Sequence, residues 1–213
     1  MKKILLLLML IFSSPASAQS DKIDLIMRED TLGTTKAYLE SILGPARKKY
    51  QDRFQYNLDG CIVSVTYNND AVNSIALENL SQSCTFNITN VLRNVPSKMV
   101  HNITFGDLKN ISASYSILET CLYACGNAYD PYFTVLYRPA RAYSIYRFTV
   151  KSDITTNVPT EKLIQQLLTI YPDLYGQQTI FAGGYYNKIQ YQIFYYYFFQ
   201  FFKDEKIKSI MID

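Results

Sequence analysis

The chain has 213 residues, of which 48% are hydrophobic and 18% charged, and its formal net charge is +3. This balance indicates a folded protein, because a disordered chain would be more charged and less hydrophobic. Four cysteines are too few for a disulfide scaffold of this length. A single histidine, His101, excludes any metal site that needs several histidines. We expect neither a metal nor a cofactor.

The first eighteen residues have the features of a secretory signal peptide. Lys2 and Lys3 precede the apolar run Ile4–Phe12, and the small residues Ala16–Ala18 predict cleavage after Ala18. The run is about nine residues, fewer than the roughly 20 that cross a membrane. We therefore expect a periplasmic or secreted mature chain without a transmembrane segment. It keeps 19 basic against 18 acidic side chains, so charge predicts no nucleic-acid partner.

Export permits disulfides, and four cysteines allow three pairings. We favour Cys61 with Cys84 and Cys121 with Cys125, since each pair lies within one local segment. The second pair has the spacing of one helical turn. A redox-active pair is the alternative there, although the spacing is not C-x-x-C.

The N-terminal part of the mature chain predicts one helix and a three-stranded meander. A polar leader, Gln19–Glu29, comes first, and the helix then begins at Thr34–Lys36 and ends at Gly44–Pro45. Turn residues at Asp59–Gly60 and Asn68–Asp70 separate three apolar runs. These runs predict strands at Phe54–Leu58, Ile62–Tyr67 and Val72–Leu77.

The C-terminal part has a similar order of elements. A helix is predicted from Pro159 to Leu168, followed by a long aromatic strand over Tyr185–Phe202 and a last strand over Ile207–Ile212. Because Val72–Leu77 and Ile207–Ile212 share an apolar pattern, internal duplication is one interpretation and chance similarity is the other. Two further strands are predicted between these parts, at Tyr132–Tyr137 and Tyr143–Val150.

These elements predict an α+β fold with antiparallel sheets, a helix packed on each repeat, and two helix–meander units in tandem. We expect two packed lobes. The predicted segments are the signal peptide at 1–18, a helix–meander unit at 19–94, a middle strand region with the C-x-x-x-C corner at 95–155, and a second helix–meander unit at 156–213.

The segment from Thr35 through Leu43-Gly44-Pro45 to Ile75 resembles the helix-and-meander module of the small-protein-A and beta-lactamase-inhibitor-like proteins. In that group a threonine-capped helix ends in Leu-Gly-x-Pro, whereas Gly44 is followed here directly by Pro45. The resemblance implies an exported, non-catalytic binding fold used in envelope assembly or in inhibiting another protein.

A second segment, Cys121–Pro131, resembles a fragment of uncharacterised bacterial proteins, and that resemblance implies no activity. Its sequence, with Gly126 and Asp130-Pro131, favours a tight corner stapled by the two cysteines. The alternative is a binding loop that presents polar contacts from a rigid turn. The residues of that loop are Asn127, Tyr129 and Asp130.

Eleven of the eighteen residues in Tyr185–Phe202 are aromatic. Apolar side chains on both faces of a strand favour a central, buried strand. If one row is exposed instead, its rings form an aromatic surface suited to binding a protein or a glycan. That row consists of Tyr191, Tyr195, Tyr197, Phe199 and Phe201.

No common catalytic motif is present, and His101 is expected to be exposed or singly hydrogen-bonded rather than a base. We therefore predict a non-enzymatic protein-binding module of the bacterial envelope, acting on another envelope or secreted protein. Its role would be that of an inhibitor, an immunity factor or an assembly accessory. The alternative is a secreted hydrolase of an envelope polymer that uses two carboxylates. Its candidates are Asp107, Glu119, Asp130 and Asp153.

Overall fold

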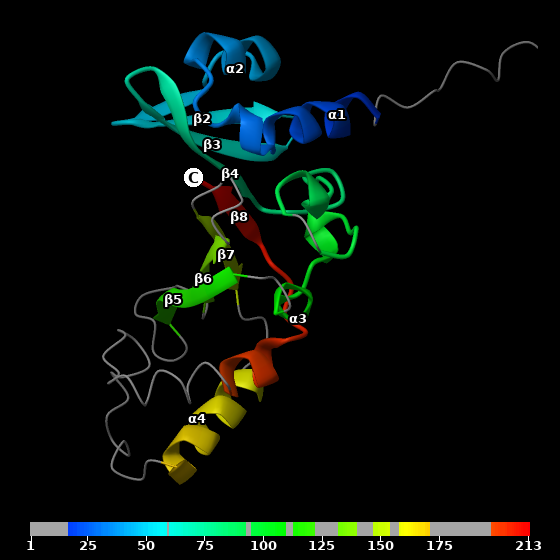
Figure 1. Cartoon of the computed structure of the whole chain (residues 1–213), viewed down its shortest axis with the longest axis vertical. Helices are drawn as coiled ribbons and strands as arrows, with labels where there is room; N and C mark the ends of the chain where they lie inside the picture. Colours follow the sequence, from blue (N-terminus) through cyan, green and yellow to red (C-terminus); the bar gives the residue numbers. More distant parts are fainter. Residues whose placement is uncertain are drawn as a thin grey trace, which may run out of the picture.

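A computed structural model of the chain describes residues 17–58, 60–92, 95–109, 113–121, 132–139, 147–153, 158–170 and 197–213. These residues form an α+β fold with one eight-stranded antiparallel sheet in the order β1-β2-β3-β4-β8-β7-β6-β5 (Figure 1). The α+β class with antiparallel pairing is thus confirmed. The strands are β1 (Lys48–Tyr50), β2 (Arg53–Leu58), β3 (Cys61–Asn68), β4 (Ala71–Glu78), β5 (Ala113–Cys121), β6 (Tyr132–Pro139), β7 (Phe148–Asp153) and β8 (Ser209–Ile212).

The α-helices are short, and three single turns of 3-10 helix accompany them. Helix α4 lies at one end of the elongated molecule, and α1 and α2 lie at the other (Figure 1). The helices are α1 (Ser17–Ile26), α2 (Lys36–Leu43), α3 (Phe105–Leu108) and α4 (Val158–Ile170), with η1 (Glu29–Thr31), η2 (Ile88–Asn90) and η3 (Val100–Asn102).

The helix and meander predicted for the N-terminal part are confirmed as α2 and β2–β4. The side chain of Thr35 caps α2 by accepting a hydrogen bond from the Tyr38 backbone N–H. Gly44 ends the helix at a φ of 78°, a left-handed conformation that glycine adopts at low cost. Local sequence therefore decides where α2 begins and ends.

Helix α1 occupies most of the segment that the sequence suggested to be a polar leader. Ile23 and Ile26 of α1 and Met27 directly after it are fully buried, and their spacing of three and four residues places them on one side. Four apolar residues among polar ones gave too weak a pattern to predict this helix. The packing partners needed to recognise it come from elsewhere in the chain.

One row of buried residues crosses six neighbouring strands and forms the centre of the core. Each member pairs directly with the next across the sheet, so all of the side chains point to the same face. The row consists of Tyr56, Val63, Leu77, Ile210, Val150 and Val135.

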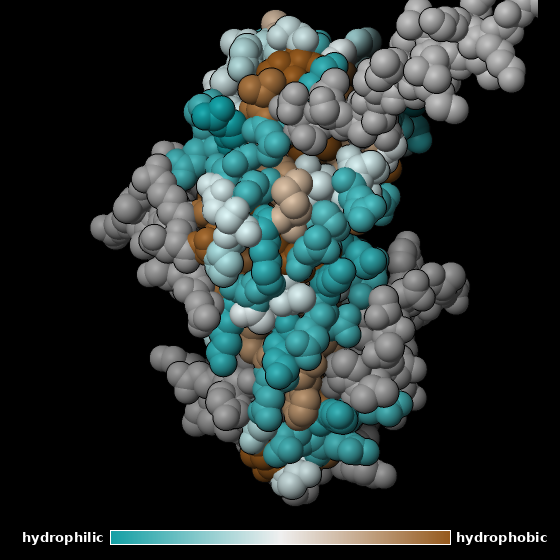
Figure 2. Space-filling model, turned by 90° about the vertical axis from the view of Figure 1, so that its right-hand side faces the viewer, coloured by the Kyte–Doolittle hydropathy of each residue, from teal (hydrophilic) through white to brown (hydrophobic). Residues whose placement is uncertain are grey.

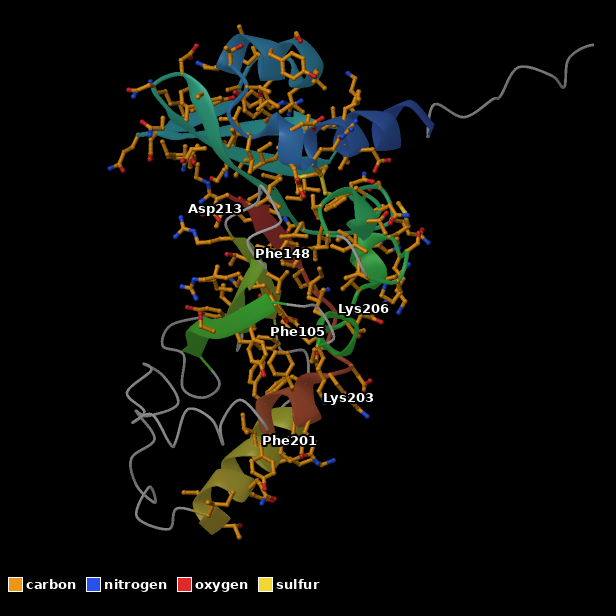
Figure 3. The ribbon with its side chains drawn as sticks, viewed as in Figure 1. Phe105, Phe148, Phe201, Lys203, Lys206 and Asp213 are labelled. Atoms are coloured by element: carbon orange, nitrogen blue, oxygen red, sulfur yellow. A yellow bond between two sulfur atoms is a disulfide. The ribbon has the colours of Figure 1, made fainter. Side chains whose placement is uncertain are left out.

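Strand β8 joins the two halves of the sheet, because it pairs with β4 on one side and with β7 on the other. Beyond β8, the backbones of Arg147 and Asp213 exchange two hydrogen bonds. Their side chains form an ion pair with a nitrogen–oxygen distance of 2.7 Å. Figure 3 shows Asp213 and Phe148 at this junction. The sheet thus runs through all three segments predicted for the mature chain.

The connection from β4 to β5 covers the core side of the sheet near β8. Ile103 accepts a backbone hydrogen bond from Ile207, and Gly106 donates one to Lys203. The ring of Phe105 packs 4.5 Å from that of Phe133. Figure 2 shows the side of the molecule on which α3 lies, and the described surface on this side is mostly hydrophilic.

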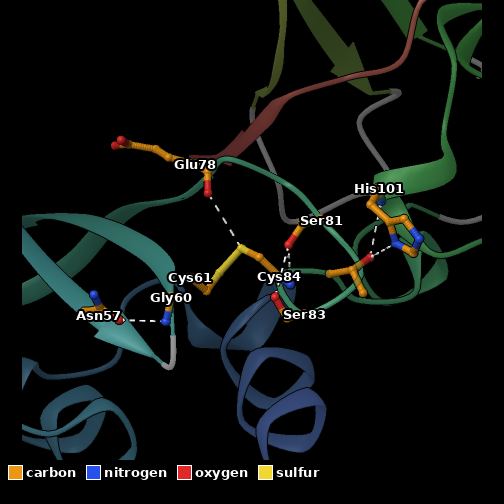
Figure 4. Close-up of a disulfide and its surroundings, with 9 residues drawn as sticks. Asn57, Gly60, Cys61, Glu78, Ser81, Ser83, Cys84 and His101 are labelled. Carbon is orange, nitrogen blue, oxygen red and sulfur yellow. Dashed lines mark hydrogen bonds between the residues drawn. A yellow bond between two sulfur atoms is a disulfide. The ribbon is translucent and has the colours of Figure 1, made fainter. Parts of the chain in front are cut away.

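The predicted Cys61–Cys84 disulfide is confirmed (Figure 4). It ties the first residue of β3 to the segment that follows β4, and both cysteines are almost fully buried. The disulfide therefore fixes one end of the connection that covers the core.

The C-terminal half differs from the sequence prediction in three elements. Strand β6 and helix α4 are confirmed, and β7 confirms the strand predicted over Tyr143–Val150 at residues 148–150, whereas residues 143–146 of that prediction lie outside the described residues. Strand β5 was not predicted. Cys121 is the last residue of β5, so the prediction that it lies in a helical turn is wrong. The prediction of an aromatic strand over Tyr185–Phe202 is also wrong at residues 197–202, which are helical. Residues 185–196 of that prediction lie outside the described residues. There Phe198 stacks on Phe202 four residues later, a contact that a helix provides and a strand does not.

The two segments whose similarity suggested a duplication are neighbours in the sheet. Val72–Leu77 lies in β4 and Ile207–Ile212 contains β8, and Ile75 pairs with Ile212. In the described residues, the meander β5–β6–β7 precedes α4 instead of following it. The duplication and the two lobes remain predictions.

We predict that replacing both Cys61 and Cys84 by alanine lowers the free energy of unfolding by about 3 kcal/mol. The chain-entropy model gives this value for a crosslink between residues 23 apart in sequence. Alanine keeps the buried positions apolar. Urea denaturation of the oxidised wild type and the double variant measures the difference, and equal midpoints would contradict the prediction.

We also predict that Gly106→Ala destabilises the protein by about 1–3 kcal/mol, the usual cost of overpacking. A Cβ at this position would lie 2.9 Å from the backbone carbonyl oxygen of Lys203, which cannot rotate away as a side chain would. Lys109→Ala, an exposed change in the same segment, is the control. Thermal unfolding of both variants tests the difference, and equal melting temperatures would refute it.

Candidate functional site

The face of the sheet opposite the core row is largely polar at its centre. Ala76 of β4 pairs with Met211 of β8, which pairs with Thr149 of β7. Ser209 of β8 pairs with Lys151 of β7 in the same way. Successive strand residues alternate between faces, so these side chains lie opposite Leu77, Ile210 and Val150.

A pocket of about 510 Å³ lies on this face, where β4, β8 and β7 adjoin. We call it the sheet-face pocket. It contains three cations, two carboxylates, several hydroxyl groups and a small apolar part. Its lining residues are Arg53, Ala76, Glu78, Asn79, Thr134, Thr149, Lys151, Asp153, Lys208, Ser209, Ile210 and Met211.

A hydrogen-bonded ion pair holds one side of the pocket. The guanidinium of Arg53 donates to the carboxylate of Glu78 and to the hydroxyl of Ser64, at 3.1 Å for the latter. Ser64 Oγ in turn donates to Glu78 Oε1 at 2.6 Å. Each of the three groups therefore orients the other two, and Arg53 balances the charge of Glu78.

The opposite side of the pocket is less tightly paired. Lys151 Nζ lies 4.0 Å from Asp153 Oδ1 and 4.4 Å from the centre of the Tyr132 ring. The amine is thus shared between a carboxylate and an aromatic face. Lys208 is exposed and makes no ion pair with any residue in the described part of the chain.

A second, larger pocket of about 820 Å³ lies beside α1, η1 and η2. It has Leu25 and Val91 as apolar lining, but its single cation, Arg28, faces three carboxylates, Asp24, Glu29 and Asp30. Asn90 donates to Asp24 at 2.7 Å, and Arg28 lies 3.4 Å from Asp30. Unlike the sheet-face pocket, it therefore has an excess of carboxylates over cations.

The described members of the predicted aromatic row lie on the 197–202 helix and not on a strand. Phe199 is only 5% exposed and packs edge-on against Tyr115. Tyr197 and Phe201 are half-buried and stack on each other, and Figure 3 shows Phe201 beside α4. Tyr191 and Tyr195 lie outside the described residues.

The predicted binding loop also lies outside the described residues, with Asn127, Tyr129 and Asp130. Cys125 lies there too, and of Cys121 only the backbone is described. The second disulfide and the loop therefore remain predictions.

His101 and Asp107 have structural partners in the connection that covers the core. His101 Nδ1 lies 2.9 Å from Thr85 Oγ1, and partial burial together with the charge of Lys206 lowers its pKa. Asp107 accepts hydrogen bonds from the backbone N–H of Thr104 and from Lys98. Partial burial alone would raise the pKa of Asp107, but these bonds outweigh it and hold that pKa below its usual range.

Of the other candidate carboxylates, only Asp153 has a described side chain, and it lies in the sheet-face pocket rather than in the connection that holds Asp107. The backbone of Glu119 pairs with Thr134, and Asp130 is outside the described residues. Where the structure describes the chain, no three His, Cys, Asp or Glu side chains group as metal ligands would. None of its described helices is long and apolar enough to cross a membrane.

No family model, curated protein or solved structure matches the chain. The resemblance of Thr35–Ile75 to the helix-and-meander proteins therefore depends on its residues alone.

Sequence reasoning did not identify the sheet-face pocket. Its polar residues alternate with core residues in β4 and β7, and such alternation predicts a solvent-facing side. Only the pairing of β8 between these strands places Glu78, Lys151 and Lys208 around one pocket.

We predict that Asp107→Asn lowers stability by about 1 kcal/mol at neutral pH, because charge-assisted hydrogen bonds become neutral ones. The folded pKa of Asp107 lies below its unfolded value. The stabilisation is therefore complete above the unfolded pKa and is lost as pH falls through the folded pKa. Urea midpoints of wild type and variant should converge at acidic pH. A gap that stays constant down to that pH would contradict this account.

Proposed function

We propose that this chain is an exported, non-enzymatic protein-binding module of the bacterial envelope, and that the sheet-face pocket is its binding surface. The observation that carries the proposal is the two-sided character of the sheet. One face holds the core row, whereas the other presents charges of both signs, hydroxyl groups and Met211 around a pocket. An inhibitor, an immunity factor or an assembly accessory would use such a surface.

The composition of the pocket supports recognition of a protein. Interfaces combine an apolar centre with polar groups at the rim, and the pocket has Ala76 and Met211 beside Arg53, Lys151 and Asp153. All of its residues except Asn79 and Lys208 project from hydrogen-bonded strands, which hold side chains more rigidly than loops do. A partner would therefore meet a largely preformed surface.

Export is supported by the Cys61–Cys84 disulfide, since such bonds persist in oxidising compartments. The N-terminal sequence supports it further, with its basic start, apolar run and small residues before Gln19. The resemblance of Thr35–Ile75 to envelope assembly and inhibitor proteins points to the same class.

A carboxylate hydrolase is the second candidate, because Glu78 and Asp153 line one pocket. A glycosidase of this kind needs one carboxylic acid that donates a proton. Glu78, however, is held by Arg53 and Ser64, and Asp153 lies beside Lys151. Each carboxylate thus already has a cationic neighbour, so we prefer the binding role. Hydrolysis of peptidoglycan or glycan that is lost in Glu78→Gln would reverse this preference.

We predict that Thr149→Trp abolishes capture of a partner, because the indole would fill the pocket between Lys151 and Met211. The matched control is Thr169→Trp on the exposed side of α4, at the far end of the molecule (Figure 1). The oxidised mature proteins are used as baits on an envelope extract of the producing organism and read by mass spectrometry. A protein enriched by wild type and by the control, but not by Thr149→Trp, supports the proposal. Equal capture by all three proteins would refute the assignment of the pocket as the binding surface. Absence of capture by wild type would refute the binding role.

A further inference from the structure

We propose that the sheet-face pocket binds an acidic segment of its partner protein, in which carboxylate side chains alternate with aliphatic ones. This inference depends on the binding role proposed above and specifies the chemistry of the partner.

The balance of charge within the pocket favours an anionic ligand. Three cations face two carboxylates. Arg53 and Glu78 satisfy each other with the help of Ser64, so this pair has little attraction left for a ligand. The remaining charges are two lysines and Asp153, which leaves the β7–β8 side of the pocket positive.

Neither of those two lysines is held firmly by a neighbouring carboxylate. Lys151 lies at the outer limit of ion pairing with Asp153, at 4.0 Å, and rests over the Tyr132 ring. Lys208 has no ion pair within the described residues, although its charge acts on Glu205 at longer range and opposes the rise in the pKa of Glu205. Both amines can therefore accept a new carboxylate without first breaking a strong bond.

Hydroxyl groups lie near the lysines on the same face of the sheet. Ser209 pairs directly with Lys151, and Thr149 and Thr134 add hydroxyl groups at the same face. Hydroxyl groups can donate to carboxylate oxygens beside an ammonium group. Carboxylates of a bound segment would thus meet both charge and hydrogen-bond donors.

Apolar groups in the pocket distinguish an acidic protein segment from other polyanions. Met211 and Ala76 form an apolar floor directly beside the lysines. A phosphate-rich or sugar-acid polymer would leave this floor without apolar contact, whereas an aliphatic side chain next to an acidic one would cover it. The apolar floor therefore favours a protein as the occupant.

The test reverses charge without filling the pocket. We compare capture of the partner by wild type, by the double variant Lys151→Glu with Lys208→Glu, and by Lys162→Glu, an exposed control on α4. We expect about a tenfold or greater loss of affinity for the double variant and no change for the control. Raising salt should weaken wild-type capture in the same direction. If the double variant does not fold, Lys208→Ala serves in its place, because it changes only one exposed side chain. We expect Lys208→Ala to lose affinity for the partner to a smaller extent than the double variant.

The chemistry of the occupant is read by photo-crosslinking. A benzoylphenylalanine replaces Gln55, which lies two residues from Arg53 on β2 and outside the pocket lining. A control crosslinker replaces Thr169. Mass spectrometry of the crosslinked peptide from the partner should find several aspartates or glutamates next to aliphatic residues.

The outcomes separate this inference from the proposed function. If Thr149→Trp loses capture of the partner but the charge-reversed variant keeps it, the pocket binds a protein and the inference of an acidic segment is wrong. A crosslinked peptide without acidic residues, or a crosslinked glycan, also overturns the inference. If wild type captures no partner, the binding role itself fails, and the inference fails with it.

Discussion

The structure depends on the insertion of β8 between β4 and β7. Leu77, Ile210 and Val150 lie side by side across these three strands and belong to one buried row. Burial of such residues contributes about 1.5–3 kcal/mol for each side chain. Because β8 has only four residues, few positions connect the two halves of the sheet. The Arg147–Asp213 pair extends this short connection by further hydrogen bonds.

The same insertion creates the candidate binding surface. A strand that turns Ile210 to the core must turn Ser209 and Met211 to the other face. There they meet Glu78 and Lys151, which come from segments far from β8 in the sequence. Core and pocket are thus two sides of one pairing, so a change that shifts the register of β8 would disturb both.

Several residues that looked suited to chemistry serve the fold instead. Asp107 caps a short helix and pairs with Lys98, and His101 contacts Thr85 in the segment fixed by the Cys61–Cys84 disulfide. Phe199 packs among the aromatic rings of the core side. Polar and aromatic side chains of this kind stabilise the connection that covers the sheet. Their types alone do not distinguish such a role from a functional one.

The sequence by itself determined the elements whose signals are local. Caps, turn residues and short-range periodicity specify the capped helix α2, the meander β2–β4, helix α4 and the last strand. The Cys61–Cys84 pairing followed from the position of both cysteines within one local segment. Tertiary structure decided the rest. Helix α1 depends on distant packing partners, and residues 197–202 are helical because their rings contact one another and β6 in that form. The pocket required a strand order that brings residues 53, 78, 151 and 208 together, and single-chain periodicity carries no information about which strands become neighbours.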